Sequence, residues 1–157
     1  MQLPFETRGR RVDESIQILQ RLFTEDTVEH HGEFFDFQPV GFEPKPVQKP
    51  WPPMHIGGDS PAAIRRAATL ADGWIPMAQS LDTLPANIAK LHRLRAEAGR
   101  EGTCTVSVIG IDDISVDGLR RYEEIGVDRV LVVPWTTKDR VGDIARFGDE
   151  VIPFFHA

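Results

Sequence analysis

From residue 54 onward, the chain alternates short apolar runs with amphipathic stretches at a regular period. This alternation constrains the fold most, because strands separated by helices pair side by side as a parallel sheet. The run over residues 130–133 is apolar at every position, which is typical of a parallel strand covered on both faces. The pattern predicts strands at 54–57, 73–77, 103–109 and 129–133, and helices at 61–70, 84–98, 116–125 and from about 138 onward.

The first 53 residues follow a different pattern. Apolar residues recur at helical spacing from Val12 to Phe23, and two short extended arms flank Gly32, which predicts a helix and then a hairpin. The many prolines between residues 39 and 53 exclude a helix there. We therefore expect a single domain over residues 1–157, with a helix at 1–23, a hairpin and proline-rich insertion at 24–53, and βα units at 54–157.

Composition and charge narrow the possible partners. A formal net charge of −6 argues against a nucleic-acid partner, since phosphate backbones are bound by basic surfaces. No apolar run approaches the roughly 20 residues of a membrane span, and no signal-peptide pattern is present. We therefore expect no membrane partner and a cytoplasmic protein. Cys104 lies in an apolar run, which favours a small buried hydrophobic residue over a nucleophile.

The turn after the first apolar run of the βα region is the strongest candidate site. Gly57 and Gly58 are followed at once by Ser60, a favoured N-cap, and by Pro61, which suits the first helical position. A helix N-terminus presents backbone N–H groups and the positive end of its dipole, and glycine lets a ligand approach closely. The pattern fits an anion site, and it also fits a tight strand-to-helix turn without a ligand.

Other polar residues give weaker signals. Asp112 and Asp113 follow the third predicted strand, where they could handle protons, although acidic residues before a helix more often cap it. His30 and His31 are adjacent, so an extended arm would point them to opposite faces and make them a poor metal pair. His55 precedes the glycine turn and could line it. No zinc-protease motif, Cys/His cluster or nucleophile elbow is present.

Several motifs along nearly the whole chain resemble the luciferase-like monooxygenase superfamily, especially its flavin- or deazaflavin-dependent oxidoreductases. The proline-linked block over residues 42–58 is the most specific of them. The other matching segments are residues 6–14, 32–35, 71–74 and 125–130. The fold of that family is a (β/α)8 barrel with an insertion. The resemblance therefore implies an α/β fold, the C-terminal half of a TIM-type barrel, with about four parallel strands and their helices.

The resemblance also implies an activity and a cofactor. It points to hydride transfer or monooxygenation of a small organic substrate with a reduced deazaflavin coenzyme (F-420), the more expected cofactor, or with FMN. In the family, the loop after this strand holds the cofactor phosphate, so the two glycines would admit it and the Ser60 hydroxyl and nearby amides would donate to it. Asp59 would face away and help cap the helix. The implied cofactor-binding residues are Gly57, Gly58, Asp59, Ser60, Ala62, Ala63, Trp74 and Met77, and Trp135 could also wall the ring. The alternative for the ring-wall residues is ordinary core packing, which is favoured for Trp74.

The first half of the barrel has no counterpart here, and with it the positions nearest the reacting atoms. A late start, a cut chain or a partner chain that supplies the rest would each account for this. We name no catalytic residue and expect no turnover from the isolated chain. The alternative function is a non-catalytic half-barrel that acts as an assembly subunit or a small-ligand binder.

An open half-barrel also predicts association. It leaves two sheet edges unpaired and exposes an inner face, for which the apolar candidates are Ile56, Ile75, Val106, Val108, Val130 and Val132. The sequence alone does not fix which alternate residues of each strand point inward. We therefore expect a homodimer, or a partner that supplies the first half-barrel.

Overall fold

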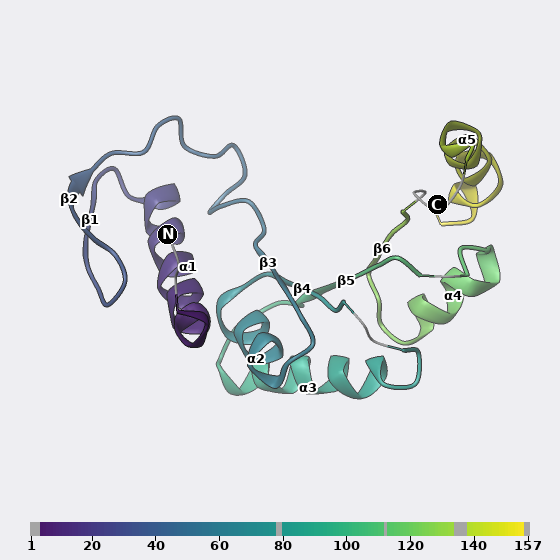
Figure 1. Cartoon of the computed structure of the whole chain (residues 1–157), viewed down its shortest axis with the longest axis horizontal. Coiled ribbons are helices and arrows are strands. Elements are labelled where there is room, and N and C mark those ends of the chain that lie inside the picture. Colours follow the sequence, from purple (N-terminus) through teal and green to yellow (C-terminus); the bar gives the residue numbers. More distant parts are fainter. Residues whose placement is uncertain (1–3, 78–79, 112, 134–137, 156–157) are drawn as a thin grey trace.

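A parallel four-stranded sheet forms the centre of the computed structural model, which describes residues 4–77, 80–111, 113–133 and 138–155. Figure 1 shows α2, α3 and α4 along one face of this sheet, the N-terminal elements beside β3, and α5 beside β6. The strands are β3 (His55–Gly57), β4 (Gly73–Ile75), β5 (Thr105–Ile109) and β6 (Arg129–Leu131), hydrogen-bonded in that order. The helices between and after them are α2 (Pro61–Leu70), α3 (Leu84–Glu97), α4 (Val116–Glu124) and α5 (Arg140–Glu150).

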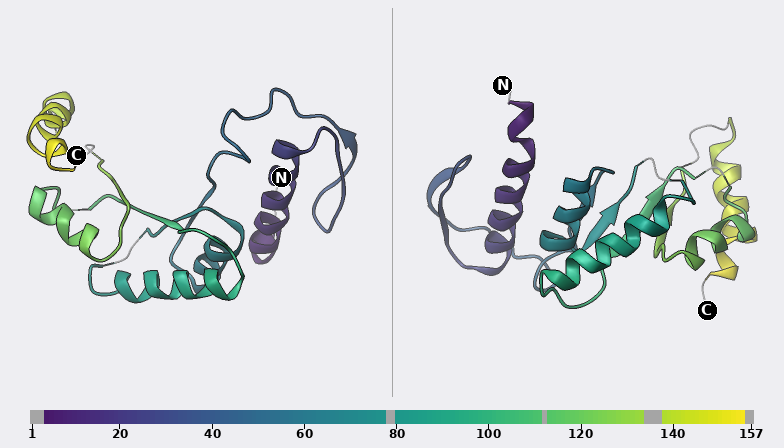
Figure 2. Two further views of the ribbon diagram at one scale, coloured as in Figure 1. Left: turned by 180° about the vertical axis from the view of Figure 1, so that it is seen from behind. Right: turned by 90° about the horizontal axis from the view of Figure 1, so that it is seen from below.

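The predicted βα alternation is confirmed, and the strand ends are shorter than expected. β4 was expected to run to residue 77 and β6 to residue 133, but their pairing with neighbouring strands ends at Ile75 and Leu131. β6 is also an edge strand with one exposed face, so the expectation of cover on both faces is wrong for it. Figure 2 shows from below how the helices cross the strands on a single side.

The pairing register decides which residues point toward the helices. Ile56, Trp74 and Val106 are register partners across three strands, and Val108 pairs with Val130. All five belong to the core or pack against it. Because side chains alternate along a strand, the opposite face carries His55, Ile75, Ser107, Ile109, Arg129 and Leu131.

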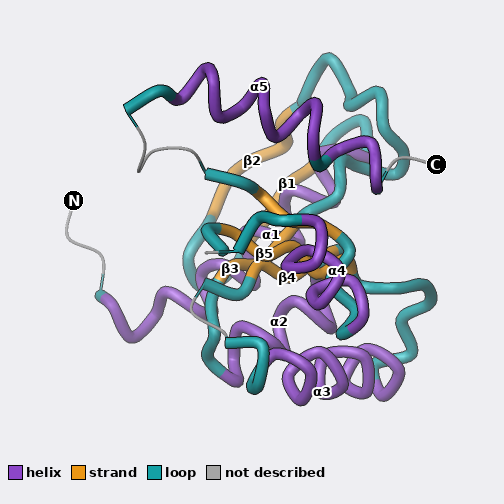
Figure 3. The backbone as a smooth tube through the Cα atoms, turned by 90° about the vertical axis from the view of Figure 1, so that its right-hand side faces the viewer, coloured by secondary structure: helices purple, strands orange, loops and turns teal. Residues whose placement is uncertain are grey.

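The prediction of an apolar inner face left open which alternate residues point inward, and the strand register decides it. Of its six candidates, Ile56, Val106, Val108 and Val130 pack toward the helices, and only Ile75 among the strand residues lies on the inner face. The physical reason is that α2, α3 and α4 all lie on one side of the sheet, so the larger apolar set is buried there. Figure 3 shows the same asymmetry end-on, with α2 and α3 together on one side of the strands.

Small residues bring α2 close to the sheet. Ala67 and Ala68 are fully buried beside Ile64, and Leu91 of α3 closes the other side of this core. Arg95 is buried as well, and its guanidinium donates to the carbonyls of Ala68 and Ala71 and to two loop carbonyls. These bonds satisfy carbonyl groups that the end of α2 leaves without a helical partner.

The N-terminal segment is a helix followed by a hairpin, as predicted. A short 3-10 turn, η1 (Phe5–Thr7), leads into α1 (Arg8–Thr24), and β1 (Val28–His31) pairs antiparallel with β2 (Asp36–Val40). Glu14 of α1 fixes the hairpin, because its carboxylate accepts from His30 Nε2 at 2.9 Å and from the amides of Phe34 and Phe35 at 3.0 Å each. An ion pair between Asp13 and Arg66 joins α1 to α2.

A second 3-10 turn, η3 (Ile152–Phe154), follows α5. Among the helices of the described residues, none has the length and apolar character needed to span a membrane.

Candidate functional site

The glycine turn lies at the carboxyl end of β3, at the edge of the sheet where ligands bind in barrels of this kind. Gly58 has a φ of 113°, a conformation that side-chain-bearing residues rarely adopt, and its amide donates to Ile75 O at 3.0 Å. Gly57 is exposed, and a Cβ placed there would come no closer than 3.9 Å to any other group, namely Ile75 O. The protein's own packing does not require glycine at Gly57, so its missing side chain leaves open space at the turn.

The N-terminus of α2 follows as predicted. Ser60 is the N-cap, and its Oγ accepts from the Ala63 amide at 3.1 Å. The Ala63 amide is therefore committed to the cap, and the expectation that it also serves a ligand is wrong for this conformation. Within the described residues, the amides of Ser60 and Ala62 donate no hydrogen bond to the protein, and both residues are exposed.

Asp59 has a different role from the one expected. Its Oδ1 accepts from the Met77 amide at 3.0 Å, so the carboxylate ties the turn to the segment after β4, while Ser60 caps the helix. Met77 itself is 61% exposed beside the turn. A bound anion here would rely on backbone amides and the helix dipole, with one carboxylate nearby that is already engaged.

Trp74 does not offer a ring face to a ligand. The side chain is fully buried on the helix-facing side of the sheet, and its Nε1 donates to Gly58 O at 2.8 Å. Of the two expectations for Trp74, the favoured one, ordinary core packing, is confirmed, because the register turns residue 74 toward α2 and α3 and away from a cofactor ring. Through this hydrogen bond, Trp74 instead supports the glycine turn from the helix-facing side of the sheet. Trp135 lies outside the described residues.

The other polar candidates have partners of their own. Asp113 accepts from the Ser115 hydroxyl at 2.6 Å and from the Ser115 amide at 3.1 Å, and these bonds hold the pKa of Asp113 below its usual value. It therefore supports the start of α4, as acidic residues before a helix often do. Asp112 lies outside the described residues.

The candidate histidines do not form a site. His30 and His31 do not share a partner, and His55 does not lie in the glycine turn. His30 and His31 contact different carboxylates, those of Glu14 and Asp36. His55 lies at the amino end of β3, away from the turn. Within the part of the chain that the structure describes, no three His, Cys, Asp or Glu residues gather as a metal site.

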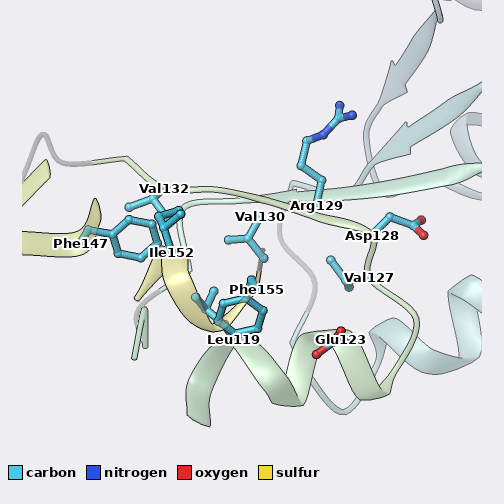
Figure 4. Close-up of a pocket in the computed structure, with 10 residues that line it drawn as sticks. All are labelled: Leu119, Glu123, Val127, Asp128, Arg129, Val130, Val132, Phe147, Ile152 and Phe155. Carbon is cyan, nitrogen blue, oxygen red and sulfur yellow. The ribbon is translucent and has the colours of Figure 1, made fainter. Parts of the chain in front are cut away.

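A separate hollow of about 320 Å³ lies between β6, α4 and the C-terminal elements (Figure 4). Leu119, Val130, Phe147 and Phe155 give it an apolar lining, and Glu123 lies at its border. It is on the helix-facing side of β6, so it is not continuous with the edge that carries the glycine turn.

Sequence comparison places these features in a family. Residues 1–117 match the sequence profile of luciferase-like monooxygenases. The chain belongs to the luciferase-like monooxygenase family. An uncharacterized protein of Mycobacterium tuberculosis is 39% identical over 162 residues, which cover 97% of this chain and 55% of that protein. The FMNH2-dependent dimethylsulfone monooxygenase of Pseudomonas putida is 32% identical over 100 residues, covering 64% of this chain and 27% of that enzyme.

Solved structures agree on the fold. The coenzyme F420-dependent tetrahydromethanopterin reductase of Methanopyrus kandleri superposes with a TM-score of 0.79 at 16% identity, over 94% of this chain and 64% of that one. An F420-dependent secondary alcohol dehydrogenase gives a TM-score of 0.71 at 14% identity, over 83% of this chain and 58% of that one. This luciferase-like chain thus has the C-terminal half of a (β/α)8 barrel. It spans about half the length of the curated relatives that it matches most fully.

Sequence reasoning missed two features of this face. The link from Asp59 to the Met77 amide joins segments 18 residues apart, and no local pattern indicates it. Ser107 lies within an apolar run and Arg129 lies directly before one, and only the strand register shows that these two polar residues share a side of the sheet.

Proposed function

We propose that this chain is the cofactor-phosphate-binding half of an oxidoreductase that uses a reduced deazaflavin coenzyme or FMN. The observation that carries the proposal is the turn at Gly57 and Gly58, where open space adjoins two uncommitted amides at the N-terminus of α2. Family membership supports the oxidoreductase class. The named relatives include both F420-dependent and FMNH2-dependent enzymes, so the comparisons leave the choice of cofactor open.

The residues present fit a phosphate group. The amides of Ser60 and Ala62 would donate to its oxygens, the Ser60 hydroxyl keeps its own proton to donate, and the dipole of α2 favours negative charge at this end. The bound cofactor would supply the hydride or activate oxygen, and this chain would hold and orient it. On the inner face above the sheet, Ile75, Ile109 and Leu131 give an apolar surface near the same edge. That surface would exclude water from one side of the ring.

Calorimetric titration with each cofactor tests the proposal. Wild-type protein should bind, with the deazaflavin coenzyme as the tighter ligand that the resemblance favours. Gly57→Val should weaken binding at least tenfold, the equivalent of losing one hydrogen bond to a charged group. The variant should remain folded, because valine suits a strand and a Cβ at this position meets no close neighbour. Equal binding by wild type and Gly57→Val would contradict the proposed site.

The chain offers a matched control for the helix cap. Ser60 and Ser115 cap α2 and α4 in the same way, each accepting from the amide three residues on at 3.1 Å. Replacing either with alanine should cost about 1 kcal/mol of stability. Only Ser60→Ala should also weaken cofactor binding. A chain that ignores both cofactors, and shows no oxidation of the reduced forms, would instead support the non-catalytic half-barrel.

A further inference from the structure

The glycine turn contains an acidic residue and no lysine or arginine. Asp59 directly precedes the N-cap Ser60, so a carboxylate is built into the connection from strand to helix. The segments that meet at the turn, residues 54–64 and 72–77, contain no lysine or arginine either. The first basic residue of α2 is Arg65, more than one helical turn beyond the cap. An anion at this turn would therefore meet backbone amides and the helix dipole rather than a cationic side chain of these segments.

The number of free donors at the turn is small. Within the described residues, the amides of Ser60 and Ala62 are uncommitted. Pro61 has no N–H, and the Ala63 amide donates to Ser60 Oγ at 3.1 Å. A phosphodiester has two non-bridging oxygens and one charge, so two amides can serve both oxygens. A phosphate monoester has three such oxygens and close to two charges above its second pKa of about 6. The donor count and the half charge of a helix N-terminus both suit the diester better.

The carboxylate of Asp59 is held close to these donors. Its Oδ1 accepts from the Met77 amide at 3.0 Å, which keeps the side chain at the turn. Covalent geometry places its carboxyl carbon within about 5 Å of the Ser60 amide nitrogen. A phosphorus atom whose oxygen accepts from that amide lies about 4 Å from the same nitrogen. The carboxylate and a bound phosphate would therefore be at most roughly 9 Å apart, whichever way the ligand is turned.

Repulsion over this distance depends on the charge of the phosphate. At roughly 9 Å, the carboxylate weakens the binding of one unit charge about twofold at the dielectric constant of water, and about twentyfold at an effective value of about 20. A monoester carries one charge more than a diester, so it bears this penalty twice. FMN ends in a phosphate monoester, whereas the phosphate of the deazaflavin coenzyme is a diester. The same carboxylate therefore acts more strongly against FMN.

We propose that Asp59 is a specificity-determining residue that shifts the preference of the turn from a phosphate monoester to a phosphodiester, and so from FMN to the deazaflavin coenzyme. This inference rests on the proposed function, since it requires a cofactor phosphate at the turn. Asp59 also ties the turn to Met77, and asparagine can keep that tie because its side-chain oxygen accepts in the same way. Asp59→Asn therefore removes the charge and retains the hydrogen bond.

Calorimetric titration with FMN and with its phosphate methyl ester isolates the charge of the phosphate. The two probes share a ring and a ribityl chain, and the ester carries one charge less. Asp59→Asn should raise the affinity for FMN relative to the ester at least threefold at low ionic strength, where screening is weak. Asp59→Glu keeps the charge and should keep the wild-type ratio of the two affinities. Affinity for the deazaflavin coenzyme should rise less in Asp59→Asn than affinity for FMN does.

Asp117→Asn is the matched control. Asp117 is an exposed residue in the first turn of α4, which follows β5, two strands along the sheet from β3. Its replacement makes the same charge change at another helix N-terminus and should leave the ratio of affinities unchanged. An equal ratio in wild type and Asp59→Asn would overturn this inference and leave the cofactor site standing. If wild type binds neither probe nor the deazaflavin coenzyme, the proposed function fails, and the inference fails with it.

Discussion

The hydrogen bond from Trp74 to the glycine turn makes a quantitative prediction. Trp74→Phe removes the indole N–H that donates to Gly58 O at 2.8 Å from a fully buried position. Leaving a buried carbonyl without its donor costs about 1–3 kcal/mol. The smaller ring also leaves a space in the core beside Ile64 and Val106, for which about 1 kcal/mol is a reasonable minimum. We therefore expect a loss of roughly 2–4 kcal/mol in the free energy of unfolding.

Urea unfolding followed by circular dichroism measures this loss without depending on tryptophan fluorescence. Trp51→Phe is the matched control, since Trp51 is only half-buried and donates to Asp72 Oδ2 at 3.2 Å. Asp72 keeps bonds from Met54 and Arg100 in that variant, so we expect a loss of only about 1 kcal/mol. The reasoning fails if Trp74→Phe costs less than about 1 kcal/mol, or no more than Trp51→Phe does.

Two further predictions concern titratable groups. Burial acts to raise the pKa of Glu14, but hydrogen bonds from His30, Phe35 and Phe34 outweigh it and hold that pKa below its usual value. Its contribution to stability is therefore complete above about pH 4.3, the pKa of an unfolded glutamate, and is lost as the pH falls through the folded-state pKa. Acid titration should loosen the hairpin of wild type, monitored by amide exchange at Phe34 and Phe35, and Glu14→Gln should be loosened already at neutral pH; identical exchange in both proteins at pH 7 would count against this role. Burial also raises the pKa of Cys104, whose thiol contacts Ala67 O, so it should react with a thiol reagent only at the rate of unfolding, and fast labelling of the native protein would contradict this.

Local chemistry in the sequence determined much of the βα region. Ser60 and Pro61 predict the start of α2 at the observed residue, because a cap and a first-turn proline act within a few positions of each other. Gly99 likewise predicts the end of α3, and it adopts the left-handed conformation with a φ of 66°. The glycine pair also marks the turn at the end of β3. The positive φ at Gly58 favours glycine whatever the surrounding structure is, because it is a property of the local backbone.

Only the tertiary structure decided what the two faces of the sheet do. A shift of one residue in strand register exchanges the faces, and short apolar runs do not fix that register by themselves. Placing α2, α3 and α4 on one side turned Trp74 from a possible ring contact into the buried support of the glycine turn. The same arrangement put Ser107 and Arg129 together on the face opposite these helices. Long-range pairing brings these groups to one face, and no periodicity within a single segment carries that information.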